Sequence, residues 1–206
     1  MPYSIDPLTA DCYDGTACLI NKFNIRDSSQ LSEIEARITF ARASELEQHP
    51  ISGAFDFEHY KAIHRFLFED IYSWAGQIRT VDMTKKGTSF TKASDIERNA
   101  AACFNRLQSM NFFTDLRFQD FVEEIVDFYC TTNILHPFRE GNGRTQRAFL
   151  TQLIRHAGYD IDFSEIDPDE LMIATIYSAN GIIDYLRELF LVHISPFTDQ
   201  EFTQTM

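Results

Sequence analysis

The sequence lacks the cysteine patterns that mark a zinc site or a disulfide-stapled domain. Its four cysteines form no CxxC pair and no cluster with histidine; they are Cys12, Cys18, Cys103 and Cys130. Structural zinc sites and disulfide frameworks both depend on such spacing. We therefore expect reduced thiols, as in a cytosol, and neither zinc nor disulfides.

Basic residues are scarce relative to acidic ones. The chain has 18 Lys and Arg against 31 Asp and Glu, which gives a formal net charge of -13. A protein that holds nucleic acid by neutralising its phosphates needs a basic face. We expect no direct contact with nucleic acid, although a local basic cluster would still be able to bind a small anion.

Long apolar runs are missing too. No stretch approaches the ~18 consecutive apolar residues that cross a bilayer, and the first residues lack the basic and apolar regions of a secretion signal. We expect a soluble, cytoplasmic protein that does not enter a membrane. With 206 residues, 44% of them hydrophobic, the chain can bury a core as one domain or one domain with an arm.

Helical periodicity dominates the rest of the chain. Capping residues at 27–29 precede apolar positions at Leu31, Ile34, Ile38 and Ala41, so we predict a helix over 26–48. A second helix is predicted from an N-cap at Asp56 to Gly76. Its apolar stripe comprises Tyr60, Ile63, Leu67, Ile71 and Trp74.

One segment breaks the helical pattern. Residues 77–94 carry β-prone residues at Ile78, Thr80 and Val81 and again from Thr88 onward, on either side of a Lys-Lys-Gly break, so we predict a short hairpin. Further helices are predicted over 94–110, 116–135, 144–158, 167–180 and 182–194. The predicted fold class is all-α, a mainly helical bundle with one short β-hairpin.

Between two predicted helices lies the loop HPFREGNG at 136–143. Gly141 and Gly143 allow backbone conformations closed to other residues and let N–H groups face a ligand. The following helix N-terminus adds unpaired N–H donors and partial positive charge, which favour an anion. We expect Phe138 to anchor this loop in the core.

Four side chains around the loop fit phosphate chemistry. Arg144 and Arg147 are three residues apart and share a helix face, and two guanidinium groups suit a polyphosphate. Glu140 would repel an anion unless a cation lay between them, and Mg2+ takes carboxylates together with substrate phosphates. His136 titrates near neutrality and can accept a proton from a hydroxyl. Each feature alone is usually structural, but together they indicate a nucleotide site.

The segment HPFREGNGRTQR at 136–147 resembles the signature of the Fic (Fido) family, HPFx[DE]GNGRxxR, at every specified position. The likeness extends to the helix, the Trp-Ala-Gly turn and the hairpin before it. The resemblance implies a Fido domain at 50–192, an N-terminal arm and helix at 1–49 packed on it, and a tail at 193–206. It also implies transfer of AMP from ATP to a Tyr, Thr or Ser hydroxyl of a target protein, with Mg2+ as cofactor.

The resemblance assigns roles to the matching positions. His136 would deprotonate the target hydroxyl, and Glu140 would hold Mg2+. Arg144 would contact the β phosphate and Arg147 the γ phosphate. The other nucleotide-binding positions of the loop and helix are Gly141, Asn142, Gly143 and Thr145.

The hairpin would be the family's flap. A flap aligns the target backbone by adding it as a strand, a known mode of peptide capture. The expected flap residues at the target are Lys85, Lys86, Gly87 and Thr88, and those that border the nucleotide are Lys86, Gly87, Thr88 and Ser89.

The sequence is compatible with more than one mode of regulation and more than one target. Many relatives carry an inhibitory [ST]xxxE[GN] helix; the strict motif is absent here, and Ser29 with Glu33 is either a degenerate version or an ordinary helix start. A small antitoxin would be an alternative source of the glutamate, which would make the chain the toxin of a toxin–antitoxin pair. A catalytically silent Fic-type binding module is the alternative to an enzyme. A type II topoisomerase subunit is a candidate target, and the chain itself, by autoAMPylation, is another.

Overall fold

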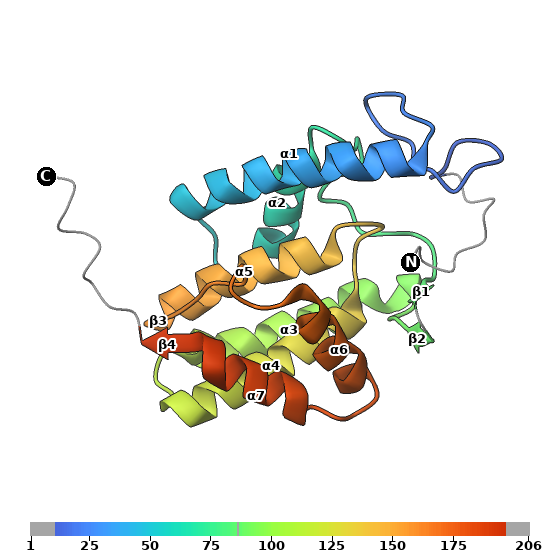
Figure 1. Cartoon of the computed structure of the whole chain (residues 1–206). Helices are drawn as coiled ribbons and strands as arrows, with labels where there is room; N and C mark the ends of the chain where they lie inside the picture. Colours follow the sequence, from blue (N-terminus) through green and yellow to red (C-terminus); the bar gives the residue numbers. More distant parts are fainter. Residues whose placement is uncertain (1–10, 86, 197–206) are drawn as a thin grey trace, which may run out of the picture.

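The computed structural model describes residues 11–85 and 87–196, and it confirms a mainly helical fold (Figure 1). The helices are α1 (Ser28–Gln48), α2 (Phe57–Phe68), α3 (Ile96–Ser109), α4 (Phe118–Leu135), α5 (Asn142–His156), α6 (Pro168–Ala179) and α7 (Asp184–His193). Short 3-10 turns occupy Ala93–Asp95 and Asn111–Phe113. Two antiparallel strand pairs complete the fold: β1 (Thr84–Lys85) with β2 (Thr88–Ser89), and β3 (Tyr159–Ile161) with β4 (Ile194–Pro196).

Aspartates begin three of the helices. Asp27, Asp56 and Asp167 each accept at least one backbone N–H from the first turn of α1, α2 and α6 respectively. Those N–H groups have no partner inside the helix, so the caps stabilise each helix by about 1 kcal/mol. Pro168 occupies the first turn of α6, where its missing N–H is not needed.

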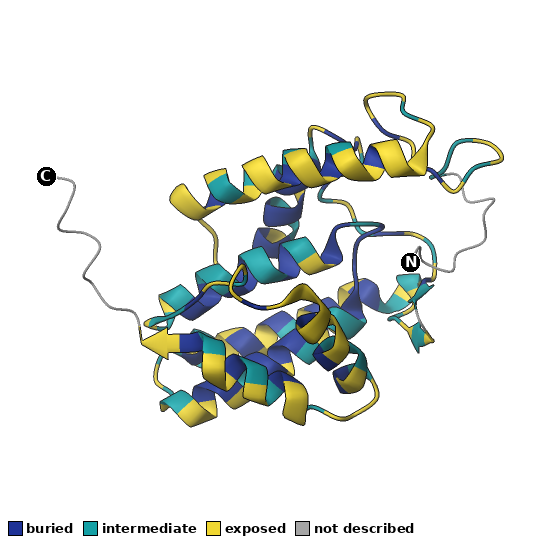
Figure 2. Cartoon of the chain, viewed as in Figure 1, coloured by how far each residue is buried: buried dark blue, intermediate teal, exposed yellow. Residues whose placement is uncertain are grey.

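The core surrounds α4 and α5. Helix α4 packs against α3, α5, α6 and α7, and α5 packs against α1, α2 and β3. Figure 2 shows buried residues along α2 and α4, whereas α1 lies across the bundle with an exposed outer face. The largest fully buried side chains include Tyr60, Tyr72, Phe68, Phe113, Phe121, Phe138, Phe149 and Phe190. This packing fixes both helices that flank the loop 136–141.

Helix α2 ends earlier than predicted, at Phe68 rather than near Gly76. The chain turns instead, with the N–H groups of Ile71 and Tyr72 both donating to the Phe68 carbonyl at 2.9 Å. Ile71 is nevertheless buried, and Trp74 packs against the core. The apolar periodicity continued past the helix end because the turns bury the same side of the chain.

The strands also differ from the prediction. The hairpin is confined to Thr84–Lys85 and Thr88–Ser89, while Ile78, Thr80 and Val81 lie outside any strand. The pair β3–β4 was not predicted, since three-residue strands carry too little pattern to be read from sequence. Helix α5 begins at Asn142, two residues before the predicted start.

Across residues 11–85 and 87–196, no helix is both long and apolar enough to cross a bilayer. The ends of the predicted arm (1–10) and tail (197–206) lie outside the described residues. The division into an arm at 1–49, a Fido domain at 50–192 and a tail at 193–206 stays a prediction.

Candidate active site

His136 occupies the point where α4 ends and the loop begins. Its backbone is left-handed, with φ 43° and ψ 58°, while its N–H still donates to the Thr132 carbonyl at 3.1 Å. Such a conformation is uncommon for a residue with a side chain. It turns the chain sharply at the histidine and leaves the imidazole buried.

The imidazole of His136 is held on two sides. Its Nδ1 donates to the Asn133 carbonyl at 3.2 Å, so Nδ1 carries the proton and Nε2 the lone pair. The ring of Phe90 stacks on it with centroids 3.7 Å apart. Burial lowers the pKa of His136 to about 3; the contact with Asn133 opposes this shift and the charges of Arg79 and Lys85 add to it. The histidine is therefore neutral near pH 7.

Arg79 ties the loop to the segment that leads into the hairpin. Its Nε donates to the His136 carbonyl at 2.8 Å, and its backbone N–H donates to the Pro137 carbonyl at 2.8 Å. On the other side of the hairpin, the Thr91 N–H donates to the Ile134 carbonyl at 2.9 Å. Both arms of the hairpin are thus anchored to the end of α4.

Asn142 closes the loop rather than facing a ligand with its side chain. Its Oδ1 accepts from the Phe138 N–H at 2.8 Å, and its Nδ2 donates to the Phe138 carbonyl at 2.7 Å. The Phe138 ring is fully buried and stacks on His64 at 3.8 Å, as expected of an anchor. Both polar atoms of the Asn142 side chain thus hold the loop, and its backbone N–H is the group placed for the predicted contact with a phosphate.

Gly141 is required by both space and conformation. Its φ is +81°, and a Cβ placed there would lie 2.2 Å from Cζ of Phe68. The Thr145 N–H is the first to bond within α5, to the Gly141 carbonyl at 3.0 Å, so the N–H groups of residues 142–144 have no helical acceptor. Thr145 is buried and its hydroxyl also donates to that carbonyl, which gives it a structural role.

Glu140 is partly exposed and lies beside this N-terminus. Its Oε1 accepts from the Gly141 N–H at 2.8 Å and is 3.5 Å from Nη2 of Arg144. Behind it, His64 accepts from the Gly76 N–H through Nδ1 at 2.8 Å, so its Nε2 must carry the proton that is donated to the Glu140 carbonyl at 3.0 Å. Burial lowers the pKa of His64 to about 3, which keeps this link neutral.

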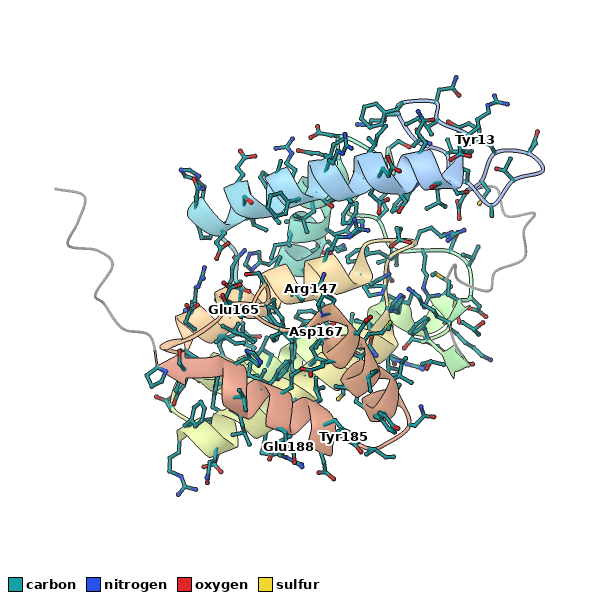
Figure 3. The ribbon with its side chains drawn as sticks, in the orientation of Figure 1. Tyr13, Arg147, Glu165, Asp167, Tyr185 and Glu188 are labelled. Atoms are coloured by element: carbon teal, nitrogen blue, oxygen red, sulfur yellow. The ribbon has the colours of Figure 1, made fainter. Side chains whose placement is uncertain are left out.

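The two signature arginines have different surroundings. Arg144 is directed at α1, where it pairs with Glu35 and donates to Oγ1 of Thr39 at 3.0 Å. Arg147 forms no ion pair with any of the described residues, and burial lowers its pKa. Figure 3 labels Arg147 on α5, close to the segment that leads into α6. Of these two arginines, only Arg144 pairs with a carboxylate among the described residues.

A cavity of about 370 Å3 opens beside His136. Its polar side includes His136, Gly143, Arg147 and Gln146. Its apolar side is formed by Phe90, Phe163, Ile166, Leu171, Met172 and Ile176. A second cavity of about 470 Å3 lies on the α1 side of α5 and shares Arg147 and Phe163 with the first. Arg147 thus lies at the boundary of both.

The hairpin borders the first cavity. Lys85 and Thr88 line it, Gly87 occupies the turn with φ +82°, and Ser89 is exposed. Lys86 lies outside the described residues. The structure therefore brings part of the predicted flap to the predicted base, on the same side of α5 as Arg147.

The carboxylate of α1 that reaches the site is Glu35, not Glu33. Glu33 and Ser29 are exposed, whereas Glu35 is buried on the same face as Leu31 and Thr39. Sequence reasoning missed Glu35, Thr39, Tyr72, Arg79 and His64. One signal was present: Glu35 follows Leu31 by four residues, so a charged side chain lies on a face that begins apolar.

The family model described as Fic/DOC matches residues 54–154. The chain is 40% identical over 177 residues to a probable protein adenylyltransferase, y4lH, of Sinorhizobium fredii, covering 85% of this chain and 89% of the relative. It is 33% identical to the probable protein adenylyltransferase Fic of Escherichia coli, covering 92% and 94%.

A longer relative is the protein adenylyltransferase VbhT of Bartonella schoenbuchensis, 37% identical over 89% of this chain; the match spans only 38% of the relative's length. Among solved structures, BepC of Bartonella tribocorum with bound AMPPNP superposes with a TM-score of 0.86 at 28% identity, covering 91% of this chain and 97% of that one. A Fic domain of Bartonella quintana with bound ADP gives 0.86 at 31% identity, covering 90% and 94%. The chain belongs to the Fic/DOC family.

Proposed function

We propose that this chain is a protein adenylyltransferase that transfers AMP from ATP to a hydroxyl group of a target protein. The observation that carries the proposal is that a neutral imidazole, an open helix N-terminus and an arginine without an ion-pair partner among the described residues surround one cavity. Relatives named protein adenylyltransferases and Fic structures solved with AMPPNP or ADP support it.

The reaction proceeds by in-line displacement at the α phosphate. Nε2 of His136 takes the proton of the target hydroxyl, and the hydroxyl oxygen forms a bond to the α phosphorus. The bond from that phosphorus to the oxygen bridging the α and β phosphates breaks, and pyrophosphate leaves with the electron pair. The charges of the bound phosphates raise the pKa of His136 from about 3 and so make it a stronger base.

The phosphates bind at the N-terminus of α5. The N–H groups of Asn142 and Gly143 neutralise negative charge there. Arg147 contacts the terminal phosphate at the boundary of the cavity, and the apolar lining around Phe163 receives the base. The proposed positions of the terminal phosphate and of the base both follow from the position of the cavity between α5 and α6.

Mg2+ fits this arrangement as an ion that accompanies the nucleotide. Within the part of the chain that the structure describes, no group of three or more Asp, Glu, His or Cys side chains is placed to hold a metal alone. Glu140 supplies one partly exposed carboxylate, and Mg2+ commonly binds one or two carboxylates plus substrate phosphates. When bound, the ion would neutralise phosphate charge beside Glu140.

The hairpin is the proposed docking edge for the target. Among the described strands, β1 and β2 pair only with each other, and a short hairpin of this kind can bind a peptide by strand addition. A target segment added along residues 84–89 would bring its hydroxyl toward His136. From the family resemblance we propose a type II topoisomerase subunit as the target class. The four free thiols fit action in a reducing cytoplasm.

A second proposal concerns control by a small antitoxin. Arg147 has no ion-pair partner among the described residues, and the cavity of about 470 Å3 on the α1 side of α5 reaches it. A glutamate delivered by a partner would pair with Arg147 and displace the terminal phosphate. A short neighbouring gene that encodes the [ST]xxxE[GN] motif is expected, and addition of its product should abolish transfer.

Incubation with α-labelled ATP and Mg2+, alone and with cell lysate, tests the main proposal. The wild-type chain is expected to label protein, including itself if autoAMPylation occurs, and His136→Ala is expected not to. Mass spectrometry of the labelled bands should find an AMP adduct on Tyr, Thr or Ser. A wild-type protein that binds ATP but labels nothing would instead support the silent binding module.

A further inference from the structure

Glu35 is a buried carboxylate in the middle of α1 that pairs with Arg144, 109 residues away. A buried charge is costly unless it is paired and hydrogen-bonded. Both of its oxygens have partners, since Oε1 accepts from Arg144 and Oε2 from the Tyr72 hydroxyl. Burial, and then the charge of Glu35, raise the pKa of Tyr72, so the phenol remains a donor.

Thr39 adds a second contact one turn further along α1. Its hydroxyl donates to the Glu35 carbonyl at 2.8 Å and accepts from Nη1 of Arg144 at 3.0 Å. The two Nη atoms of Arg144 are therefore both held by α1. The guanidinium group is planar, so two contacts in its plane define its orientation.

The aromatic ring of Phe68 lies against the guanidinium group of Arg144. The centroid of the ring is 4.7 Å from Cζ of Arg144. The same ring lies against Gly141, where a Cβ would meet it at 2.2 Å. Arg144 is thus fixed relative to the α5 N-terminus by an ion pair, a hydrogen bond and an aromatic face.

A competing partner lies on the other side. Oε1 of Glu140, in the loop before α5, is 3.5 Å from Nη2 of Arg144. Without Glu35, Arg144 would move onto Glu140 and neutralise it. Glu35 is the nearer of the two carboxylates and therefore limits how closely Glu140 pairs with Arg144.

We propose that Glu35, aided by Thr39, is a positioning residue for the adenylyl transfer reaction. It holds Arg144 so that its remaining N–H groups meet the phosphate chain beyond the α phosphate, and it leaves Glu140 available to nucleotide-borne Mg2+. This inference rests on the proposed function. The contact differs from an inhibitory lock, because Glu35 engages Arg144 from within the packed core, between buried Leu31 and Leu46, and leaves Arg147 open to the cavity.

Calorimetry with ADP and with AMP, both with Mg2+, tests the proposal on Glu35→Gln. The variant keeps the size of the side chain and an acceptor for Arg144 but removes the charge. Its affinity for ADP is expected to fall about tenfold while that for AMP changes less than about twofold, and kcat/KM for transfer is expected to fall about ten- to hundredfold. The matched control is Glu45→Gln on the exposed side of α1, which should behave as wild type.

Other outcomes would overturn the proposal. Faster transfer by Glu35→Gln would identify a lock, and an equal loss of ADP and AMP binding would identify a purely structural role. If Glu35→Gln fails to fold, as judged by thermal melting, Thr39→Val removes one contact to Arg144 with little change in volume and should show a smaller, equally ADP-selective loss. A wild-type protein without transfer activity would instead refute the proposed function.

Discussion

The loop 136–141 and the hairpin β1–β2 face the same cavity but are built differently. The loop is mostly buried and is fixed by Asn142, which follows it, and by Arg79 and His64 from elsewhere in the chain. The hairpin has only two residues in each strand and is partly exposed. The proposed chemistry lies on the buried loop, while the proposed target contact lies on the partly exposed hairpin.

This difference predicts where each kind of defect will appear. Changes in the loop should affect transfer to every acceptor, because the groups that act on ATP lie there. Changes in the hairpin should depend on the acceptor, because a strand edge contributes backbone hydrogen bonds to the target.

His136→Ala should lower the rate of transfer by about 10²- to 10⁴-fold, the usual contribution of general acid–base catalysis. Nucleotide binding should persist, because the phosphates are proposed to bind at α5 rather than at the imidazole. Labelling kinetics measure the transfer rate, and calorimetry on the same preparation measures the affinity for the nucleotide. A variant that transfers AMP at the wild-type rate would remove His136 from the mechanism.

Gly141→Ala should destabilise the protein by about 2 kcal/mol or more and abolish ATP binding, because the new Cβ meets Phe68 in a backbone with φ +81°. Gly158→Ala is the matched control at the other end of α5. It has φ +88° and nothing within 4 Å of its Cβ, so only about 1 kcal/mol is expected. Urea unfolding measures both, and equal losses would show that Phe68 does not matter.

Ser89→Pro should raise KM for the protein target roughly three- to tenfold, the equivalent of one backbone hydrogen bond. The Phe90 N–H donates to the Met83 carbonyl at 3.2 Å, so by the alternation of an antiparallel ladder the Ser89 N–H points away from its partner strand. Ser89→Ala removes the hydroxyl but keeps that N–H. Comparison of the two variants therefore separates the effect of the N–H from the effect of the hydroxyl. KM for ATP and for the target rising together would argue against strand addition.

Acidification should destabilise the fold through its buried histidines. Burial lowers the pKa of His59, and it lowers those of His64 and His136 to about 3, below the value of about 6.5 in an unfolded chain. The unfolded chain therefore binds protons at a higher pH than the folded chain does. The free energy of unfolding that the neutral histidines contribute is present above about pH 6.5, and it is lost as the pH falls from there toward about 3.

Between pH 7 and pH 6 we expect a loss of about 0.7 kcal/mol per histidine from His64 and His136. Urea unfolding at the two pH values measures this loss of stability. The control is His49→Gln at an exposed position, and this variant should lose as much stability as the wild type does. Because His136 is neutral in the same pH range, we expect the acidic limb of the pH–activity profile to lie below about pH 6.5. Stability that is constant between pH 7 and 6 would contradict the burial argument.

Much of the candidate site could be predicted because it is contiguous in sequence. His136, Glu140, Arg144 and Arg147 lie within twelve positions, and the need for glycine at 141 follows from a loop that meets a helix. The prediction could not separate the environments of the two arginines. Three residues apart on one helix, they have the same local pattern, yet only one meets a carboxylate from α1.

The sequence alone determined the helices, their aspartate caps and the residues of the loop, because these depend on backbone preferences and short-range spacing. Tertiary structure decided that α2 ends at Phe68, that Phe90 stacks on His136 and that Glu35 rather than Glu33 reaches Arg144. These features arise from burial between segments far apart in the chain. A local sequence pattern does not predict which buried group a distant segment will contact.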